Sequence, residues 1–111
     1  MTSTNIAATT PRFARIWRGR TTRDRADEYE RYWLETGVDP LIAKGALSVQ
    51  MLREDRTNET EFVTISLWTD IESMAPGDDP YRAHHLQRDR DFLLELPERV
   101  QILRVLECRP A

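Results

Sequence analysis

Runs rich in bulky, β-branched and aromatic residues predict four β-strands in this chain. The strongest example is 61–69 (EFVTISLWT), where aromatic and β-branched residues follow one another with few interruptions. Weaker versions of the same pattern occupy 13–20, 46–53 and 100–106. The polar cluster EDRTNET at 54–60 is typical of a turn, so it separates the second predicted strand from the third.

Both faces of the strongest strand are apolar. One face carries Phe62, Thr64, Ser66 and Trp68, and the other carries Val63, Ile65 and Leu67. A strand of this kind is normally covered on both sides. One layer of helices can cover only one face of a sheet, so a second copy of the chain is the simplest cover for the other. The pattern therefore predicts a homodimer joined through the open face of the sheet.

Helical spacing of apolar residues predicts one helix over 25–35 and a second over 81–94. The first helix has an aromatic face that includes Trp33, and this face is expected to pack in the core. Gly37 ends this helix, and Asp39-Pro40 predicts a turn after it.

The predicted elements follow the order β-α-β-β-α-β. This is the ferredoxin-like arrangement, so we expect an α+β fold with a four-stranded antiparallel sheet. Residues 12–111 are expected to form one domain. Residues 1–11 (MTSTNIAATTP) contain no periodic apolar face and are expected to form a flexible polar tail.

Composition narrows the class of protein without indicating an activity. Hydrophobic residues make up 40% and charged residues 32%, which is typical of a globular domain. The net charge of −3 provides no overall attraction to nucleic acid or to an anionic membrane. Cys108 is the only cysteine, so no intrachain disulfide can form and a reducing compartment is favoured. With no signal-peptide pattern and no membrane-spanning run of ~20 apolar residues, a cytoplasmic protein is expected.

Known catalytic motifs are absent from the sequence. It contains no phosphate-binding loop, no dinucleotide fingerprint, no nucleophile elbow and no zinc-protease helix. His84 and His85 are the only histidines, and on a helix they would point about 100° apart. We therefore expect no metal site.

Three tryptophans and one histidine are the candidate functional residues. Trp17, Trp33 and Trp68 could line a pocket, although large aromatic residues more often fill a small core. Trp33 fits the core, whereas Trp68 ends a strand and is the best pocket candidate. His84 could transfer protons near neutral pH, although a single helical histidine is more often structural. The run Arg88-Asp89-Arg90-Asp91 is interpreted as a solvated helix face with local ion pairs.

Four stretches together resemble the antibiotic-biosynthesis monooxygenase domain family. They are FARIWRGRTT, DEYERYWLETGVDPL, EFVTISLWTDIESM and PGDDPYRAHH. The resemblance covers about 12–106, depends most on Trp68 and the loop at 77–80, and is strongest for small uncharacterised bacterial members. It implies a dimeric α+β barrel, in which two ferredoxin-like subunits pack their sheets face to face.

One branch of this family degrades haem. That branch has an Asn on the first strand, a Trp in the second helical region and a His ten residues after that Trp. Here His84 matches, but Met74 holds the position of the Trp, and Ile16 and Trp17 stand where the Asn is expected. Haem degradation is therefore disfavoured, while His84 as an axial ligand stays open.

Other members of the family oxidise phenols or quinols without a metal or flavin, because an electron-rich substrate anion can itself reduce oxygen. The resemblance therefore implies no cofactor and a small aromatic substrate. It implies a wall formed by Trp17 and Trp68, a catalytic base at His84 or His85, and an anion partner at Arg15 or Arg18. A non-catalytic dimer that binds a small ligand or assists a pathway protein is the second interpretation, and both stay open.

Overall fold

The structure is a computed structural model of the 111-residue chain, and it describes residues 10–75, 77 and 79–110. Most of the predicted tail, residues 1–9, lies outside this part of the chain. The strands are β1 (Phe13–Thr22), β2 (Ser48–Asp55), β3 (Glu59–Trp68) and β4 (Gln101–Arg104). The helices are the 3-10 turn η1 (Arg23–Arg25), α2 (Ala26–Thr36), α3 (Val38–Lys44) and the short α4 (Asp89–Phe92).

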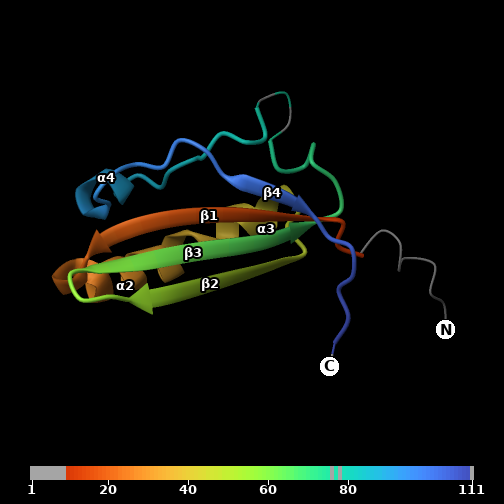
Figure 1. Cartoon of the computed structure of the whole chain (residues 1–111). Helices are drawn as coiled ribbons and strands as arrows, with labels where there is room; N and C mark the ends of the chain where they lie inside the picture. Colours follow the sequence, from red (N-terminus) through yellow and green to blue (C-terminus); the bar gives the residue numbers. More distant parts are fainter. Residues whose placement is uncertain (1–9, 76, 78, 111) are drawn as a thin grey trace.

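The four strands form one antiparallel sheet in the order β2-β3-β1-β4 (Figure 1). β1 and β3 are its central pair, and Ile16 on β1 lies opposite Ile65 on β3. The four predicted strands are confirmed, with ends shifted slightly from the expected positions. With helices packed on one face, the sheet has the ferredoxin-like α+β fold, so the predicted fold class is also confirmed.

Helices α2 and α3 cover one face of the sheet (Figure 1). The aromatic face of α2 packs on β3, where the Phe62 ring meets Tyr29 and Trp33 edge-on at centroid distances of 5.0 and 5.2 Å. All three side chains are buried. Gly37 caps α2, and its backbone N–H donates to the Trp33 carbonyl at 2.8 Å. The predicted first helix and its core-facing side are therefore confirmed.

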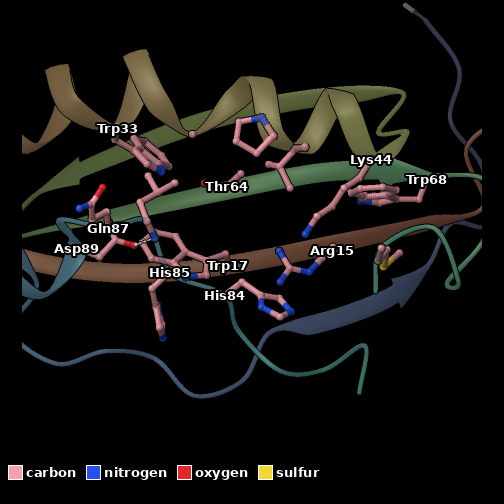
Figure 2. A pocket seen from close by; sticks show the side chains of 15 residues that line it. Arg15, Trp17, Trp33, Lys44, Thr64, Trp68, His84, His85, Gln87 and Asp89 are labelled. Carbon is pink, nitrogen blue, oxygen red and sulfur yellow. Dashed lines mark hydrogen bonds between the residues drawn. The ribbon is translucent and has the colours of Figure 1, made fainter. Parts of the chain in front are cut away.

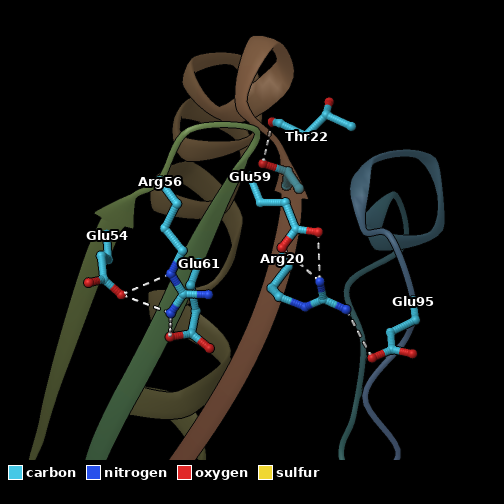
Figure 3. Close-up of polar contacts among 8 residues, drawn as sticks. Arg20, Thr22, Glu54, Arg56, Glu59, Glu61 and Glu95 are labelled. Carbon is cyan, nitrogen blue, oxygen red and sulfur yellow. Dashed lines mark hydrogen bonds and ion pairs between the residues drawn. The ribbon is translucent and has the colours of Figure 1, made fainter.

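The other face of the sheet carries no helix in the described part of the chain. Its centre is apolar and is formed by Ile16, Leu52, Val63, Ile65, Leu67 and Leu103. Leu52 and Leu103 remain 46% and 48% exposed. Ion pairs lie at one end of this face: Arg20 contacts both carboxylate oxygens of Glu59 at 2.8 Å (Figure 3).

The prediction of a long second helix over 81–94 is wrong. Only α4 is helical, and the backbone before it pairs with the returning chain. The Ala83 N–H donates to the Glu98 carbonyl at 2.9 Å, and the Val100 N–H donates to the Tyr81 carbonyl at 2.8 Å. These long-range bonds hold the segment against the returning chain, so tertiary pairing overrides the helical spacing.

A second correction concerns Asp39-Pro40, where the sequence predicts a turn. The structure instead places both residues in the first turn of α3. Proline is tolerated there because an N–H in the first turn has no helical partner to lose. Gly45 ends α3 with a φ of 115°, a left-handed conformation that favours glycine. No helix in the described residues is long and apolar enough to cross a membrane.

Candidate active site

A cavity of about 380 Å³ lies between the helix-covered face of the sheet and the segment that precedes α4. Figure 2 draws the residues that line it. They come from β1, β3, the helices α2 and α3 with Gly37 between them, the 84–89 segment, and Met74 in the loop after β3. The volume falls within the ~300–1,000 Å³ that is typical of small-molecule sites.

Tryptophans form the apolar wall of this cavity. Trp17 on β1, Trp33 on α2 and Trp68 on β3 all line it. The rings of Trp17 and Trp33 lie 6.2 Å apart between centroids. The Trp68 indole N–H donates to Ser66 Oγ at 2.9 Å, which fixes this ring at the end of the strand. Trp33 is thus both a core residue and part of the wall.

Trp17 differs from Trp68 because its indole N–H has no hydrogen-bond acceptor among the described residues. Its side chain is only 6% exposed, and its indole Nε1 is buried without a hydrogen-bond partner in the described part of the chain. Buried N–H groups are nearly always paired, because an unpaired one loses its bonds to water without replacement. The Trp17 indole N–H is therefore an unpaired donor within the packed part of the wall, out of contact with the open cavity.

Arg15 lies two residues before Trp17, on the same face of β1. It is 9% exposed and lines the cavity. Its Nη2 donates to the Arg82 carbonyl at a long 3.4 Å, and no described carboxylate pairs with its guanidinium. Burial lowers the pKa of Arg15 from its ordinary value. An arginine nonetheless remains charged in proteins, so the cavity contains a poorly compensated cation.

Arg18 does not join this site. Side chains alternate along a strand, so residues three positions apart point to opposite faces of the sheet. Arg18 accordingly lies on the open face, where it is 3.8 Å from Glu61 and half-exposed. The grouping of Arg18 with Arg15 as equivalent anion partners is therefore corrected, and Arg15 alone lies in the cavity.

His84 and His85 both line the cavity. The expectation that they point about 100° apart on a helix is wrong, because the chain is irregular at these residues. Figure 2 shows His84 near Arg15. His85 also lines a neighbouring polar cleft of about 500 Å³. Both histidines are exposed, so the two candidate bases have access to the cavity and to water.

Asp89 is a functional candidate that the sequence analysis missed. The interpretation of residues 88–91 as a solvated face is wrong at this position, because Asp89 is only 2% exposed and lines the cavity. The Tyr29 hydroxyl donates to its Oδ1 at 3.0 Å, and the Leu86 backbone N–H donates to its Oδ2 at 2.8 Å. Burial raises the pKa of Asp89, and these two hydrogen bonds oppose the rise. No local sequence signal marks this residue, since its partner Tyr29 is 60 positions away.

Lys44, the only lysine, is a second missed residue. It lies in the last turn of α3 and lines the cavity from an exposed position. Figure 2 shows its side chain extending toward Arg15. Within residues 10–75, 77 and 79–110, no three His, Cys, Asp or Glu side chains are grouped as they would be in a metal site.

The geometry of the cavity supports three chemical tasks. The tryptophan wall can hold a flat apolar ring, and the Arg15 guanidinium can stabilise an oxygen anion. An imidazole or the Asp89 carboxylate can take up a proton from a ligand.

Comparison with known proteins identifies a similar fold. No protein-family model and no curated protein matches the chain. A crystal structure from Bacillus cereus, of a protein provisionally described as an antibiotic biosynthesis monooxygenase, superposes with a TM-score of 0.61. The alignment covers 91% of this chain and 99% of that one, at 11% sequence identity. The chain shares the fold of that protein. The likeness supports the resemblance to the antibiotic-biosynthesis monooxygenase family, while identity this low establishes the fold alone.

Proposed function

We propose that the chain is a cofactor-independent monooxygenase of the antibiotic-biosynthesis type, which oxidises a small aromatic phenol or quinol. The observation that carries this proposal is the cavity itself. Its tryptophan wall, two histidines and buried Arg15 combine the groups that such a reaction needs, on the fold shared with the Bacillus cereus protein.

The proposed reaction needs no external electron donor. Removal of the phenolic proton gives an anion that can pass one electron to O2, and the two radicals then combine to form a carbon–oxygen bond. When this bond forms at a carbon that bears hydrogen, loss of water from the hydroperoxide leaves a carbonyl. One oxygen atom then remains in the product and the other leaves as water, so atoms and electrons balance.

Each candidate residue has a defined part in this scheme. His84 accepts the phenolic proton, and His85 is the alternative base. Arg15 stabilises the resulting anion, because a buried guanidinium is a stronger electrostatic partner than one in water. Trp17 and Trp68 hold the ring and keep water from its face.

The proposal includes a homodimer in the cytoplasm. The apolar centre of the open sheet face supports it, since a patch this apolar is normally covered. An interface that joins two such sheets should bury more than about 1,000 Å². The single Cys108 is consistent with a reducing compartment.

Oxygen consumption tests the proposal. The protein is incubated with a panel of electron-rich phenols and quinols, with no added metal, flavin or haem, and oxygen is followed with an electrode. Wild type should consume oxygen above background with at least one substrate. His84→Ala should lose most of this activity with little change in stability, because an exposed imidazole contributes little to packing. Arg31→Gln, an exposed change on α2 outside the cavity, serves as the control.

Equal rates in wild type and His84→Ala would remove His84 from the mechanism, and His85→Ala would then test the alternative base. No consumption with any substrate would favour the second candidate function, a dimer that binds a small ligand without chemistry. The exposure of both histidines favours this alternative, because water can reach the groups that the reaction requires to act in a dry site.

A further inference from the structure

The charge of Arg15 places a demand on any ligand that fills the cavity. The guanidinium is nine-tenths buried, donates one long hydrogen bond to a backbone carbonyl, and is paired with no described carboxylate. A neutral ring that enters the cavity would remove more water from this cation and give nothing in return. A ligand with its own negative charge would instead compensate the cation as it binds.

A second cation lies at the same end of the cavity. Lys44 lines the cavity from the last turn of α3, and Figure 2 shows its side chain extending toward Arg15. A negatively charged group bound at Arg15 would therefore meet a second positive charge. Arg15 itself lies on β1, in the central pair of the sheet, so it is held in place before a ligand arrives.

Charge is distributed unevenly along the cavity. Figure 2 shows Arg15 and Lys44 toward one end and Asp89 toward the other, with Trp17 between them. At the acidic end, each carboxylate oxygen of Asp89 already accepts a hydrogen bond, one from the Tyr29 hydroxyl and one from the Leu86 backbone N–H. The anionic group of a ligand is therefore directed to the end formed by Arg15 and Lys44, and its ring to Trp17.

We propose that the cavity recognises an aromatic carboxylate, whose carboxylate group binds at Arg15 while its ring packs against Trp17. This deepens the proposed function, on which it rests for the identity of the site: the substrate is a phenol that also bears a carboxylate, and Arg15 then pairs with that carboxylate in place of the phenolate. A carboxylate is ionised before any proton is removed from the phenol. It therefore provides binding in the ground state, whereas a phenolate forms only during the reaction.

Calorimetry with a matched pair of ligands tests this inference. The probes are 2-naphthoate and 2-naphthamide, which have the same ring and nearly the same shape but differ in charge. Titrations under argon measure binding alone. Wild type should bind the acid more than tenfold tighter than the amide. Arg15→Gln should lose that preference, while Arg31→Gln should keep it because Arg31 is exposed and does not line the cavity.

A second readout keeps the test decisive if Arg15→Gln does not fold. The Trp17 indole N–H resonance of wild type, assigned with Trp17→Phe, should move when 2-naphthoate binds, because the ring packs against Trp17. At the same concentration it should move much less with 2-naphthamide, which binds more weakly. Equal affinity for acid and amide in wild type, or a Trp17 resonance that does not move at saturating 2-naphthoate, would overturn the inference.

These measurements separate this inference from the proposed function, because binding requires no turnover. A strong preference for the acid in a protein that consumes no oxygen would support carboxylate recognition and contradict the monooxygenase. Oxygen consumption with neutral quinols, together with equal binding of acid and amide, would support the monooxygenase and contradict carboxylate recognition.

Discussion

Replacement of Trp33 by alanine tests whether the aromatic face of α2 holds the fold together. Trp33 is only 4% exposed and packs against the rings of Trp17, Tyr29 and Phe62 at centroid distances of 6.2, 6.2 and 5.2 Å. The substitution removes a ring from the junction between helix and sheet, and it also removes part of the cavity wall.

The expected cost follows from the area involved. A buried aromatic side chain removes ~150–250 Å² from water. At about 25 cal/mol per Å², this corresponds to ~4–6 kcal/mol, of which alanine retains a small part. Truncations of this kind in protein cores cost ~3–5 kcal/mol. We therefore expect Trp33→Ala to lower the free energy of unfolding by about 4 kcal/mol.

Urea unfolding followed by far-UV circular dichroism measures this loss. With a slope of ~2 kcal/mol per molar urea, the midpoint should fall by about 2 M. All samples must have the same protein concentration, because unfolding of a dimer depends on concentration. Leu34→Ala is the control, since Leu34 is the next residue of α2 and is 52% exposed, and it should change stability by less than ~0.5 kcal/mol. A loss below ~1 kcal/mol for Trp33→Ala would refute the assignment of this face to the core.

Three further predictions concern the buried acid and the open face of the sheet. Tyr29→Phe should cost ~1–3 kcal/mol in urea unfolding, because it leaves the buried Asp89 carboxylate with one fewer donor. Burial raises the pKa of Asp89 above its unfolded value, so its contribution to stability falls as pH rises from the unfolded value toward the folded one. Wild type should therefore gain stability relative to Asp89→Asn as pH falls from 8 toward 4, and a constant difference would contradict this. In sedimentation equilibrium, wild type should have twice the 13.0 kDa chain mass, and Ile65→Arg, at the centre of the open face, should be monomeric; a wild-type mass of 13.0 kDa would rule out the dimer.

The sheet could be predicted from the sequence because its pattern is local. The run of aromatic and β-branched residues at 61–69 lies within one strand, and the aromatic spacing around Trp33 occurs within one helix. These elements match the structure because local preference and tertiary packing agree.

The segment from 81 to 94 could not be predicted in the same way. Its apolar residues have helical spacing, but the backbone pairs with residues 98–100, which lie beyond the segment. This error placed His84 and His85 on different helix faces and Asp89 in solvent. Their true positions depend on contacts such as Tyr29 to Asp89, which join distant parts of the chain.

Candidate residues on strands were easier to place than those on loops. Arg15 and Trp17 share the cavity because alternate residues of β1 face the helices, and the same rule separates Arg18 from them. The alternation of side chains along β1 therefore distinguishes Arg15 from Arg18, which composition alone makes equivalent. Lys44 escaped notice because its position depends on how α3 packs over the sheet.

Isotope labelling tests the central claim most directly. The protein is incubated under ¹⁸O2 with the phenolic substrate that gives the fastest oxygen consumption, without added cofactor, and the product is analysed by mass spectrometry. A monooxygenase should place one ¹⁸O atom in each product molecule, in wild type and not in His84→Ala. A product that forms without ¹⁸O, or that is labelled equally in both proteins, would contradict the account.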